Sequence, residues 1–224
     1  MRTCALIPAF NEASHIAAVV EAAKRHVEKV VVIDDGSRDG TAEIAAAAGA
    51  ACLRLPSNGG KGSALQAGIA LARSQGFTHV VTLDGDGQHL PEDIPAMLRV
   101  AEEAGADLII GTRTFDRAQM PRARFYSNTI GSRVASLLVG REIRDSQCGF
   151  RLMRLDRLCA LKLRSRRYEF EMEVLIKMAR SGGAIAQAPV QMVYDQGRER
   201  SKMKPIRDTV RICLWSLVFR FQEV

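Results

Sequence analysis

Several features that would assign this chain to a particular class are missing from its sequence. Its five cysteines include no CxxC pair, so nothing indicates a disulfide framework or a zinc site, and a reducing compartment fits best. The first apolar run is too short for the core of a signal peptide, and no run approaches the roughly 18 residues of a spanning helix. We therefore expect a cytoplasmic protein whose membrane attachment is peripheral or made through a separate membrane-protein partner.

Four common phosphate and metal motifs are also absent. A Walker A loop needs Ser or Thr after its lysine, where this chain has Gly62, and no GxGxxG fingerprint follows the first apolar run. A calcium loop starting at Asp84 would need Gly in place of His89 and Glu in place of Pro95. Gln88 stands where a DxDxT phosphatase has Thr. These differences exclude a Walker A loop, a dinucleotide fingerprint and a calcium loop, and they disfavour a DxDxT phosphatase.

What the sequence does contain is a regular alternation of apolar strands and helices. With 47% hydrophobic and 25% charged residues, the 224-residue chain has the composition of one soluble domain. The strands lack an in/out alternation, which predicts an α/β fold with a parallel sheet buried on both faces and ligands bound beyond its carboxyl ends. The expected strands cover residues 3–8, 29–35, 51–56, 78–84 and 107–113, and the intervening helices cover residues 12–26, 40–49, 60–76 and 91–105.

After about Met120 this alternation changes. We expect helices over residues 121–140 and 169–183 and strands over residues 148–155 and 184–194. Residues 204–221 form a last helix, with Arg207 and Arg211 off its apolar stripe. That stripe consists of Ile206, Val210, Cys213, Leu214, Leu217 and Phe221.

Polar clusters follow the five expected strands of the first half, on what would be one edge of the sheet. The cluster after residues 78–84 reads "DGDGQ" and contains Asp84, Asp86 and Gln88. Two carboxylates and an amide oxygen suit Mg²⁺ or Mn²⁺, ions that usually share the phosphates of a substrate. An exposed turn also favours Asp and Gly, so the motif by itself is equally compatible with a plain turn.

Six segments, taken in order, resemble the family 2 glycosyltransferases. They are "IPAFNE", "VVVIDDGSRDGT", "NGGKGSALQAGI", "VVTLDGDGQHLPEDIP", "IIGTR" and "DSQCGFRLMR". The nearest branch contains dolichyl-phosphate mannosyltransferase and the bacterial polyprenyl-phosphate glycosyltransferases. The resemblance covers residues 3–202 and implies a Rossmann-like nucleotide-diphospho-sugar transferase fold, with helices on both faces of a mostly parallel sheet. We expect a catalytic domain over residues 1–202 and a basic amphipathic helix over residues 203–224.

The resemblance also implies a donor site and a divalent metal site. Asp84, Asp86 and Gln88 would hold Mg²⁺ or Mn²⁺ against the diphosphate. Asp35 would accept from the base or ribose, although it could instead cap the following helix. Lys61 could offer charge to the donor or be a solvated lysine at a helix start. The expected donor-binding residues are Pro8, Ala9, Asn11, Glu12, Asp34, Asp35, Lys61, Asp84 and Gly85.

On the acceptor side, the resemblance assigns Arg113 and Asp145 to catalysis together with Asp86. Arg113 is expected to meet a phosphate, which suits a guanidinium fork. Asp145 would be a general base for a sugar hydroxyl, whereas a phosphate monoester, with a second pKa of about 6, would only need orienting. Gln147 would support the same loop. Three residues in basic stretches that could otherwise be solvated faces are expected to contact the acceptor or donor phosphates: Arg124, Ser201 and Lys202.

The net charge of +7 favours polyanionic partners, and the resemblance makes these a nucleotide sugar and an anionic membrane surface rather than a nucleic acid. The C-terminal helix could lie on that surface or pack against protein. We predict inverting, metal-dependent transfer of a hexose from GDP-mannose or UDP-hexose to a polyprenyl phosphate at the inner face of the cytoplasmic membrane. The alternatives are transfer to a glycan or glycolipid hydroxyl in cell-surface polysaccharide synthesis and, more distantly, a non-catalytic nucleotide-sugar-binding protein.

Overall fold

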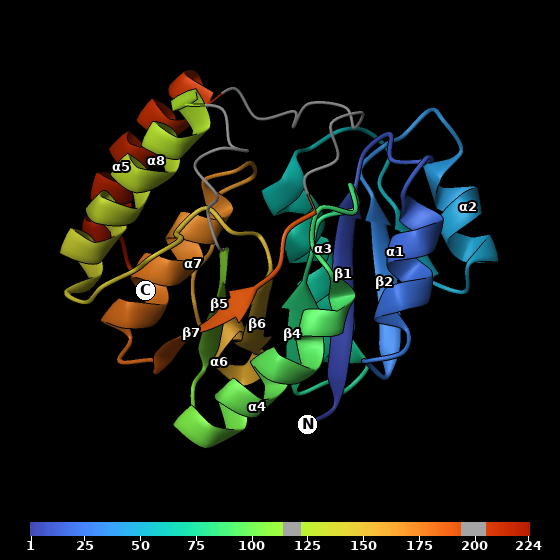
Figure 1. Cartoon of the computed structure of the whole chain (residues 1–224), viewed down its shortest axis with the longest axis horizontal. Coiled ribbons are helices and arrows are strands. Elements are labelled where there is room, and N and C mark those ends of the chain that lie inside the picture. The colour runs from blue at the N-terminus through green and yellow to red at the C-terminus, as the bar shows by residue number, and fades with distance from the viewer. Residues whose placement is uncertain (114–121, 194–204) are drawn as a thin grey trace.

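The strands form one mixed sheet. The structure is a computed structural model that describes residues 1–113, 122–193 and 205–224, with the backbone alone for residues 122–124 and 205–206 (Figure 1). Within these residues the seven strands lie in the order β3-β2-β1-β4-β6-β5-β7. β6 runs antiparallel to β4 and β5, and the other neighbours are parallel. The strands are β1 (Thr3–Ala9), β2 (Lys29–Asp34), β3 (Ala51–Arg54), β4 (His79–Thr82), β5 (Leu108–Arg113), β6 (Arg151–Arg154) and β7 (Ile185–Val190).

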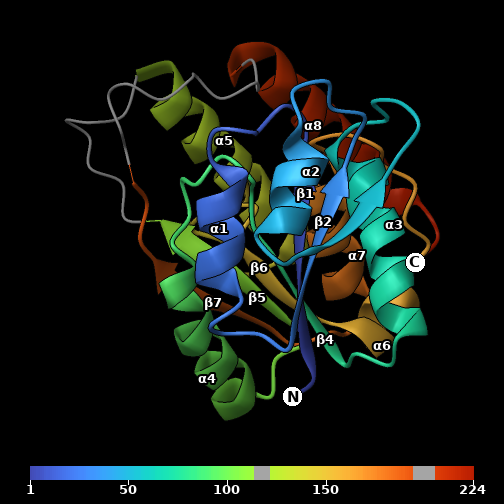
Figure 2. The ribbon, with the colours of Figure 1, turned by 90° about the vertical axis from the view of Figure 1, so that its right-hand side faces the viewer.

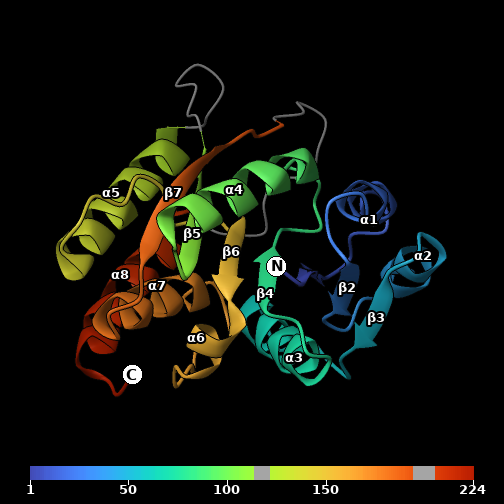
Figure 3. The same cartoon turned by 90° about the horizontal axis from the view of Figure 1, so that it is seen from below.

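Helices cover both faces of this sheet, as the view in Figure 3 shows. α1, α2 and α4 pack on one face and α3, α6 and α7 on the other, while α5 and α8 lie side by side against α7 (Figures 1 and 2). A single 3₁₀ turn, η1 (Pro91–Asp93), leads into α4. The helices are α1 (Ile16–Ala23), α2 (Thr41–Ala47), α3 (Lys61–Ser74), α4 (Ile94–Ala104), α5 (Arg122–Val139), α6 (Leu155–Cys159), α7 (Phe170–Arg180) and α8 (Pro205–Phe221).

The central strands are buried on both sides, as their unbroken apolar runs predict. Successive side chains of a strand point to opposite faces. Leu6 and Ile33 accordingly join the core under α3, and Ile7 and Val32 join the core under α1 and α4. Each of these fully buried side chains contributes about 1.5–3 kcal/mol through the hydrophobic effect. The predicted α/β fold with a mostly parallel sheet is confirmed.

The position of β6 could not be predicted from its sequence. The expected strand over residues 148–155 forms, but it inserts between β4 and β5, where the Thr82 hydroxyl donates to the Gly149 carbonyl at 2.7 Å. This brings the segment before β6 to the carboxyl end of β4. A Cβ atom on Gly149 would lie 2.5 Å from Lys61 Nζ, so only glycine fits there without displacing that side chain.

The C-terminal helix presents its predicted apolar stripe outward. The side of α8 that packs against α5 and α7 carries the buried residues Thr209, Ile212, Ser216 and Phe219. Four members of the predicted stripe are instead exposed, namely Val210, Leu214, Leu217 and Phe221. In the described part of the chain, no helix is both long and apolar enough to cross a bilayer. The predicted domain boundary, between residues 202 and 203, lies outside the described residues.

Candidate active site

A cavity of about 490 Å³ opens at the carboxyl ends of β1, β2 and β4. This volume lies in the usual range of small-molecule sites, roughly 300–1,000 Å³. Its walls come from the segment after β1, the start of α3, the segment after β4, the loop before α7 and the first turns of α8. Of the expected donor-binding residues, all except Asp34 line this cavity, which we call the donor cavity.

The two neighbouring aspartates at the end of β2, Asp34 and Asp35, make different contacts. Asp34 is fully buried, and its Oδ1 accepts from the Ser37 N–H at 2.8 Å, a bond that holds the turn between β2 and α2. Asp35 faces the donor cavity, but both of its carboxylate oxygens accept backbone N–H groups, from Gly59 and Gly60, at 2.8 Å. Asp35 therefore fixes the turn that leads into α3. A ligand that bound Asp35 would have to share carboxylate oxygens that already accept these two backbone N–H groups.

The turn after β1 is held in an uncommon backbone conformation. Asn11 has a φ of 53°, in the left-handed region that only glycine adopts readily. Its N–H donates to the Ser37 hydroxyl and its Oδ1 accepts from the Arg38 N–H, both at 2.9 Å. The Glu12 N–H donates to the Thr41 hydroxyl at 2.9 Å. These bonds tie the end of β1 to the segment after β2 and place the Glu12 side chain at the cavity wall.

Lys61 is an ion-paired residue of the cavity wall rather than a solvated lysine. Its Nζ lies 2.5 Å from Asp84 Oδ1 and 2.7 Å from Glu171 Oε1, and its side chain is only 16% exposed. Burial alone would lower the pKa of Lys61, but the two carboxylates outweigh it and raise that pKa above its usual value. The same ammonium group outweighs the burial of Asp84 and holds the pKa of that carboxyl below its usual range. This part of the site is therefore a fixed pattern of charges.

The chemistry at Asp86 fits a divalent cation. Burial, reinforced by the charge of Asp84, raises the pKa of Asp86 to about 6, so a nearby positive charge would be stabilising. Gln88 also lines the cavity, and its backbone N–H donates to Asp86 Oδ1 at 3.0 Å. Among the described residues, no group of three or more His, Cys, Asp or Glu side chains is arranged to hold a metal. An ion here would therefore need oxygens from water and from the donor phosphates, as Mg²⁺ and Mn²⁺ commonly do.

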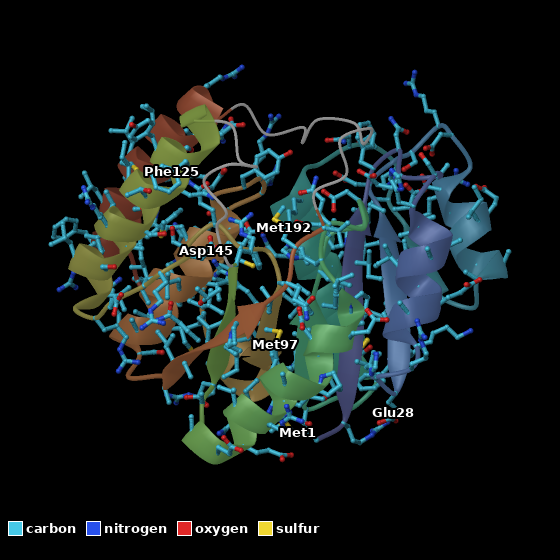
Figure 4. The ribbon with its side chains drawn as sticks, in the orientation of Figure 1. Met1, Glu28, Met97, Phe125, Asp145 and Met192 are labelled. Carbon is cyan, nitrogen blue, oxygen red and sulfur yellow. The ribbon has the colours of Figure 1, made fainter. Side chains whose placement is uncertain are left out.

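A second, smaller cavity of about 100 Å³ adjoins the first and contains Arg113. We call it the acceptor cavity; the walls of both cavities include Lys61, Asp84 and Asp86. Asp145, labelled in Figure 4 near the end of β5, is fully buried and does not line it. Its carboxylate accepts from Arg113 Nε at 2.6 Å and from Arg113 Nη2 at 2.8 Å. The geometry therefore makes Asp145 the buried partner that orients Arg113.

The remaining acceptor-side predictions divide between described and undescribed residues. Gln147 lines the acceptor cavity, and its Nε2 donates to the Ser127 carbonyl and the Thr209 hydroxyl, both at 3.4 Å, which links α5 to α8. Ser201, Lys202 and the side chain of Arg124 lie outside the described residues.

Three further residues of the site were not predicted. Glu171 pairs with Lys61, His89 is buried in the acceptor cavity with a pKa lowered by burial to about 4, and Arg211 of α8 lines the donor cavity. Glu171 lies in the first turn of α7, where a carboxylate is favoured by the helix dipole in any protein. Arg211 falls in a helix with the pattern of a membrane-surface segment. Their local sequence therefore carried no separate signal of a site.

Comparison with known proteins agrees with this geometry. The sequence model of the family described as Glycosyl transferase family 2 matches residues 4–158. The undecaprenyl-phosphate mannosyltransferase of Micrococcus luteus is 29% identical, and the match covers 99% of this chain and 97% of that protein. The UDP-N-acetylglucosamine–dolichyl-phosphate N-acetylglucosaminyltransferase of Methanococcus voltae is 28% identical, and the match covers 85% of each chain.

A solved structure shows the same fold. The crystal structure of glucosyl-3-phosphoglycerate synthase from Mycobacterium tuberculosis, in complex with Mn²⁺, UDP-glucose and phosphoglyceric acid, has a TM-score of 0.76 at 20% identity. The match covers 97% of this chain and 79% of that one. As the six sequence segments predicted, and because the family match spans well over half of its length, the chain belongs to glycosyl transferase family 2 and is a glycosyltransferase.

Proposed function

We propose that this glycosyltransferase moves a hexose from a nucleotide-diphosphate sugar, GDP-mannose or UDP-hexose, to a polyprenyl phosphate. The observation that carries the acceptor is the buried pair of Arg113 and Asp145 beside the donor cavity. A fully buried aspartate whose two oxygens are engaged by a guanidinium is poorly placed to remove a proton from a hydroxyl. A phosphate monoester is largely ionised near neutral pH, so it needs a cation to orient it and no base.

The donor half of the proposal rests on the charges of the donor cavity. Asp84, Asp86 and Gln88 would hold Mg²⁺ or Mn²⁺, which when bound supplies positive charge to the diphosphate as it leaves. Lys61, fixed between two carboxylates, adds a cation to the same wall. Relatives whose names specify mannosyl and N-acetylglucosaminyl transfer leave the sugar and base open. The structural neighbour with Mn²⁺ and UDP-glucose supports a divalent ion at such a site.

The donor cavity and the acceptor cavity share Lys61, Asp84 and Asp86 in their walls, so a donor and an acceptor bound there would be adjacent. This arrangement favours a single displacement with inversion at the transferred sugar. The acceptor oxygen would approach the sugar from the acceptor cavity while the diphosphate departs on the donor side, so no covalent intermediate on the protein is required. Cys148 is not suited to be a nucleophile, because it is fully buried and burial raises the pKa of its thiol to about 12.

Attachment to an anionic membrane surface completes the proposal, because a polyprenyl phosphate is held in a bilayer. Apart from Met1, the large hydrophobic side chains that are exposed in the described part of the chain all lie on α5 and α8. A concentration of this kind marks an interaction surface. The exposed Arg133 on α5 suits acidic headgroups. The exposed apolar residues are Tyr126, Ile130, Leu137, Val210, Leu214, Trp215, Leu217, Val218 and Phe221.

Transfer to a sugar hydroxyl is the second candidate, because one carboxylate oxygen at the acceptor cavity is free of partners. Glu171 Oε2 is buried and has no hydrogen-bond partner among the described residues, while Oε1 binds Lys61. Glu171 is thus the carboxylate that a hydroxyl acceptor would use as its general base. Glu171→Gln should slow transfer to a hydroxyl far more than transfer to a phosphate.

The direct test begins with a thermal-shift panel of nucleotide sugars with Mg²⁺ or Mn²⁺. It continues with sugar transfer from the best binder to a short polyprenyl phosphate. The wild-type protein should form a lipid-phosphate sugar that disappears with a chelator, and Asp86→Ala should fold normally and lose this activity. Full activity in Asp86→Ala would contradict a metal-dependent mechanism. Absence of both transfer and slow metal-dependent donor hydrolysis would favour a non-catalytic binding protein.

A further inference from the structure

The first turns of α8 form part of the donor cavity, although the sequence assigned this helix to a membrane surface or to packing. Arg207, Asp208, Arg211 and Ile212 line the cavity together with Lys61 and Asp84. They are more than 120 residues distant in sequence from those two side chains, and the packing of α8 against α5 and α7 brings them there. The helix that carries the outward apolar residues therefore also has a side that faces the donor.

Arg211 is the residue of α8 whose bonding is incomplete. Its Nη2 donates to Glu169 Oε1 at 3.0 Å, and Glu169 itself is only 7% exposed on its side chain. The Nε of Arg211 is buried and has no hydrogen-bond partner among the described residues. A guanidinium carries five N–H donors in one plane, and a buried donor without an acceptor is costly. The Arg211 side chain is 38% exposed and lines the donor cavity, so the N–H donors at its Nη atoms that Glu169 does not engage can bind an anionic group there.

The distribution of charge around the donor cavity agrees with this reading. One part of the wall carries the carboxylates of Glu12, Asp35, Asp84 and Asp86. The part formed by the loop before α7 and by α8 carries Arg167, Arg207 and Arg211 beside Glu169 and Asp208. A diphosphate needs cations on more than one side, and a metal held by Asp86 and its neighbours would supply one of them. Arginine suits the other, because its planar fork binds two phosphate oxygens at once.

We propose that Arg211, assisted by Arg207, binds the diphosphate of the donor, so that α8 is a wall of the donor site. The inference rests on the proposed function, since it requires a nucleotide-diphosphate donor. The backbone of α8 adds to the effect, because its N-terminal turns line the cavity and the positive end of a helix attracts phosphate. Glu169 positions the Arg211 guanidinium and leaves its remaining donors for the ligand.

The chain offers a matched control on the same helix. Arg220 lies in the last turn of α8, is exposed, and does not line the donor cavity. Arg220→Gln removes the same charge from the same helix as Arg211→Gln, but far from the proposed contact. A general effect of the protein's net charge on nucleotide binding would appear in both variants.

The experiment is isothermal titration calorimetry of UDP and of GDP, each with Mn²⁺, on the 224-residue chain. For whichever nucleotide the wild type binds, Arg211→Gln should raise Kd about 10- to 100-fold, which is the usual worth of a hydrogen bond to a charged group. Arg220→Gln should stay within about twofold of the wild type, and Arg211→Lys should be intermediate because it keeps the charge and loses the fork. A Kd for Arg211→Gln within about twofold of the wild type would overturn the inference.

Two further measurements separate a diphosphate contact from a loss of structure. Saturation-transfer NMR with the bare nucleoside, uridine or guanosine, should give the same affinity in Arg211→Gln and wild type, whereas equal weakening of nucleoside and diphosphate would overturn the proposal. If Arg211→Gln does not fold, the exposed Arg207→Gln takes its place and should raise Kd for the diphosphate several-fold; an unchanged Kd there also overturns it. A wild type that binds neither UDP nor GDP would contradict the proposed function itself.

Discussion

The pairing of Arg113 with Asp145 makes a prediction that separates an orienting role of Asp145 from a general-base role. Asp145→Asn keeps the size of the side chain but removes the charge that Arg113 contacts at 2.6 and 2.8 Å. The side chains of Arg113 and Asp145 are 11% and 0% exposed, so the variant removes a carboxylate charge from beside a nearly buried guanidinium. Removing one partner of a buried pair costs about 3–5 kcal/mol. For a chain of this length, Tm should fall by about 6–20 °C.

The kinetic effect of Asp145→Asn identifies the role of the residue. If Asp145 only orients Arg113 toward an acceptor phosphate, the variant should raise the KM for polyprenyl phosphate and leave kcat and its pH profile nearly unchanged at saturating acceptor. If Asp145 is a general base, kcat should fall by about 10²–10⁴-fold. Initial rates with a short polyprenyl phosphate across neutral pH measure both quantities.

Two controls accompany this measurement. Asp107→Asn removes another buried aspartate, which pairs with Arg154 at 3.2 Å away from both cavities, and should lower Tm without changing the acceptor KM. Adding Arg113→Gln to Asp145→Asn also removes the guanidinium charge that Asp145 contacted, so Tm should partly recover while the acceptor KM stays high. A large loss of kcat with an unchanged acceptor KM would refute the orienting role.

Four other perturbations test Asp86, the exposed side of α8 and the start of α3. Mn²⁺ affinity, measured by calorimetry, should fall as the pH drops below about 6, because burial and a neighbouring carboxylate raise the pKa of Asp86 to about 6 and a proton then competes with the ion. Without metal, the raised pKa of Asp86 means that stability is lost as the pH rises from the usual carboxyl pKa to about 6, and the loss is complete above about 6. Asp86→Asn should therefore raise Tm at neutral pH but not at acid pH, and an equal Tm at neutral pH would contradict this. Leu214→Asp, at a 62%-exposed site, should abolish the blue shift of Trp215 emission on vesicles of anionic lipid without lowering Tm, and a shift of full size would argue against docking through α8. Gly62→Ala places a Cβ 2.6 Å from a backbone oxygen of the loop before α7, and such overpacking costs about 1–3 kcal/mol. The variant should therefore lower Tm and, by displacing Lys61, weaken nucleotide binding. Unchanged nucleotide binding would show that the start of α3 does not fix the position of the Lys61 side chain.

Local sequence patterns predicted the first half of the fold well, because each element there is encoded by nearby residues. The runs that became β1, β2 and β4 are apolar enough to be buried on both faces, and glycine or polar residues end each of them. The insertion of β6 between β4 and β5 depends on pairing between segments about 70 and 43 residues apart, which no local pattern specifies. The outward direction of the α8 stripe likewise depends on what α5 and α7 cover.

Sequence patterns predicted the residues of the site that follow strand ends. They did not predict the residues that α7 and α8, which come much later in the chain, add to it. Asp84, Asp86 and Lys61 follow from the rule that ligands bind beyond the carboxyl ends of parallel strands. The burial of Asp34 and Asp145 could not be predicted from their motifs. A sequence motif does not distinguish an aspartate that stabilises a turn or pairs with an arginine from one that binds a ligand. Glu171 and Arg211 join the site only because α7 and α8 fold back over it.

We propose above all that the acceptor is a phosphate carried on a lipid. The measurement that tests it most directly is a comparison of initial rates with a short polyprenyl phosphate and with the corresponding unphosphorylated polyprenol, using the same nucleotide sugar and Mn²⁺. We expect rapid transfer to the phosphate, no detectable transfer to the alcohol, and a product whose sugar is joined through phosphate. Comparable transfer to the alcohol, or to a sugar hydroxyl in preference to the polyprenyl phosphate, would contradict it.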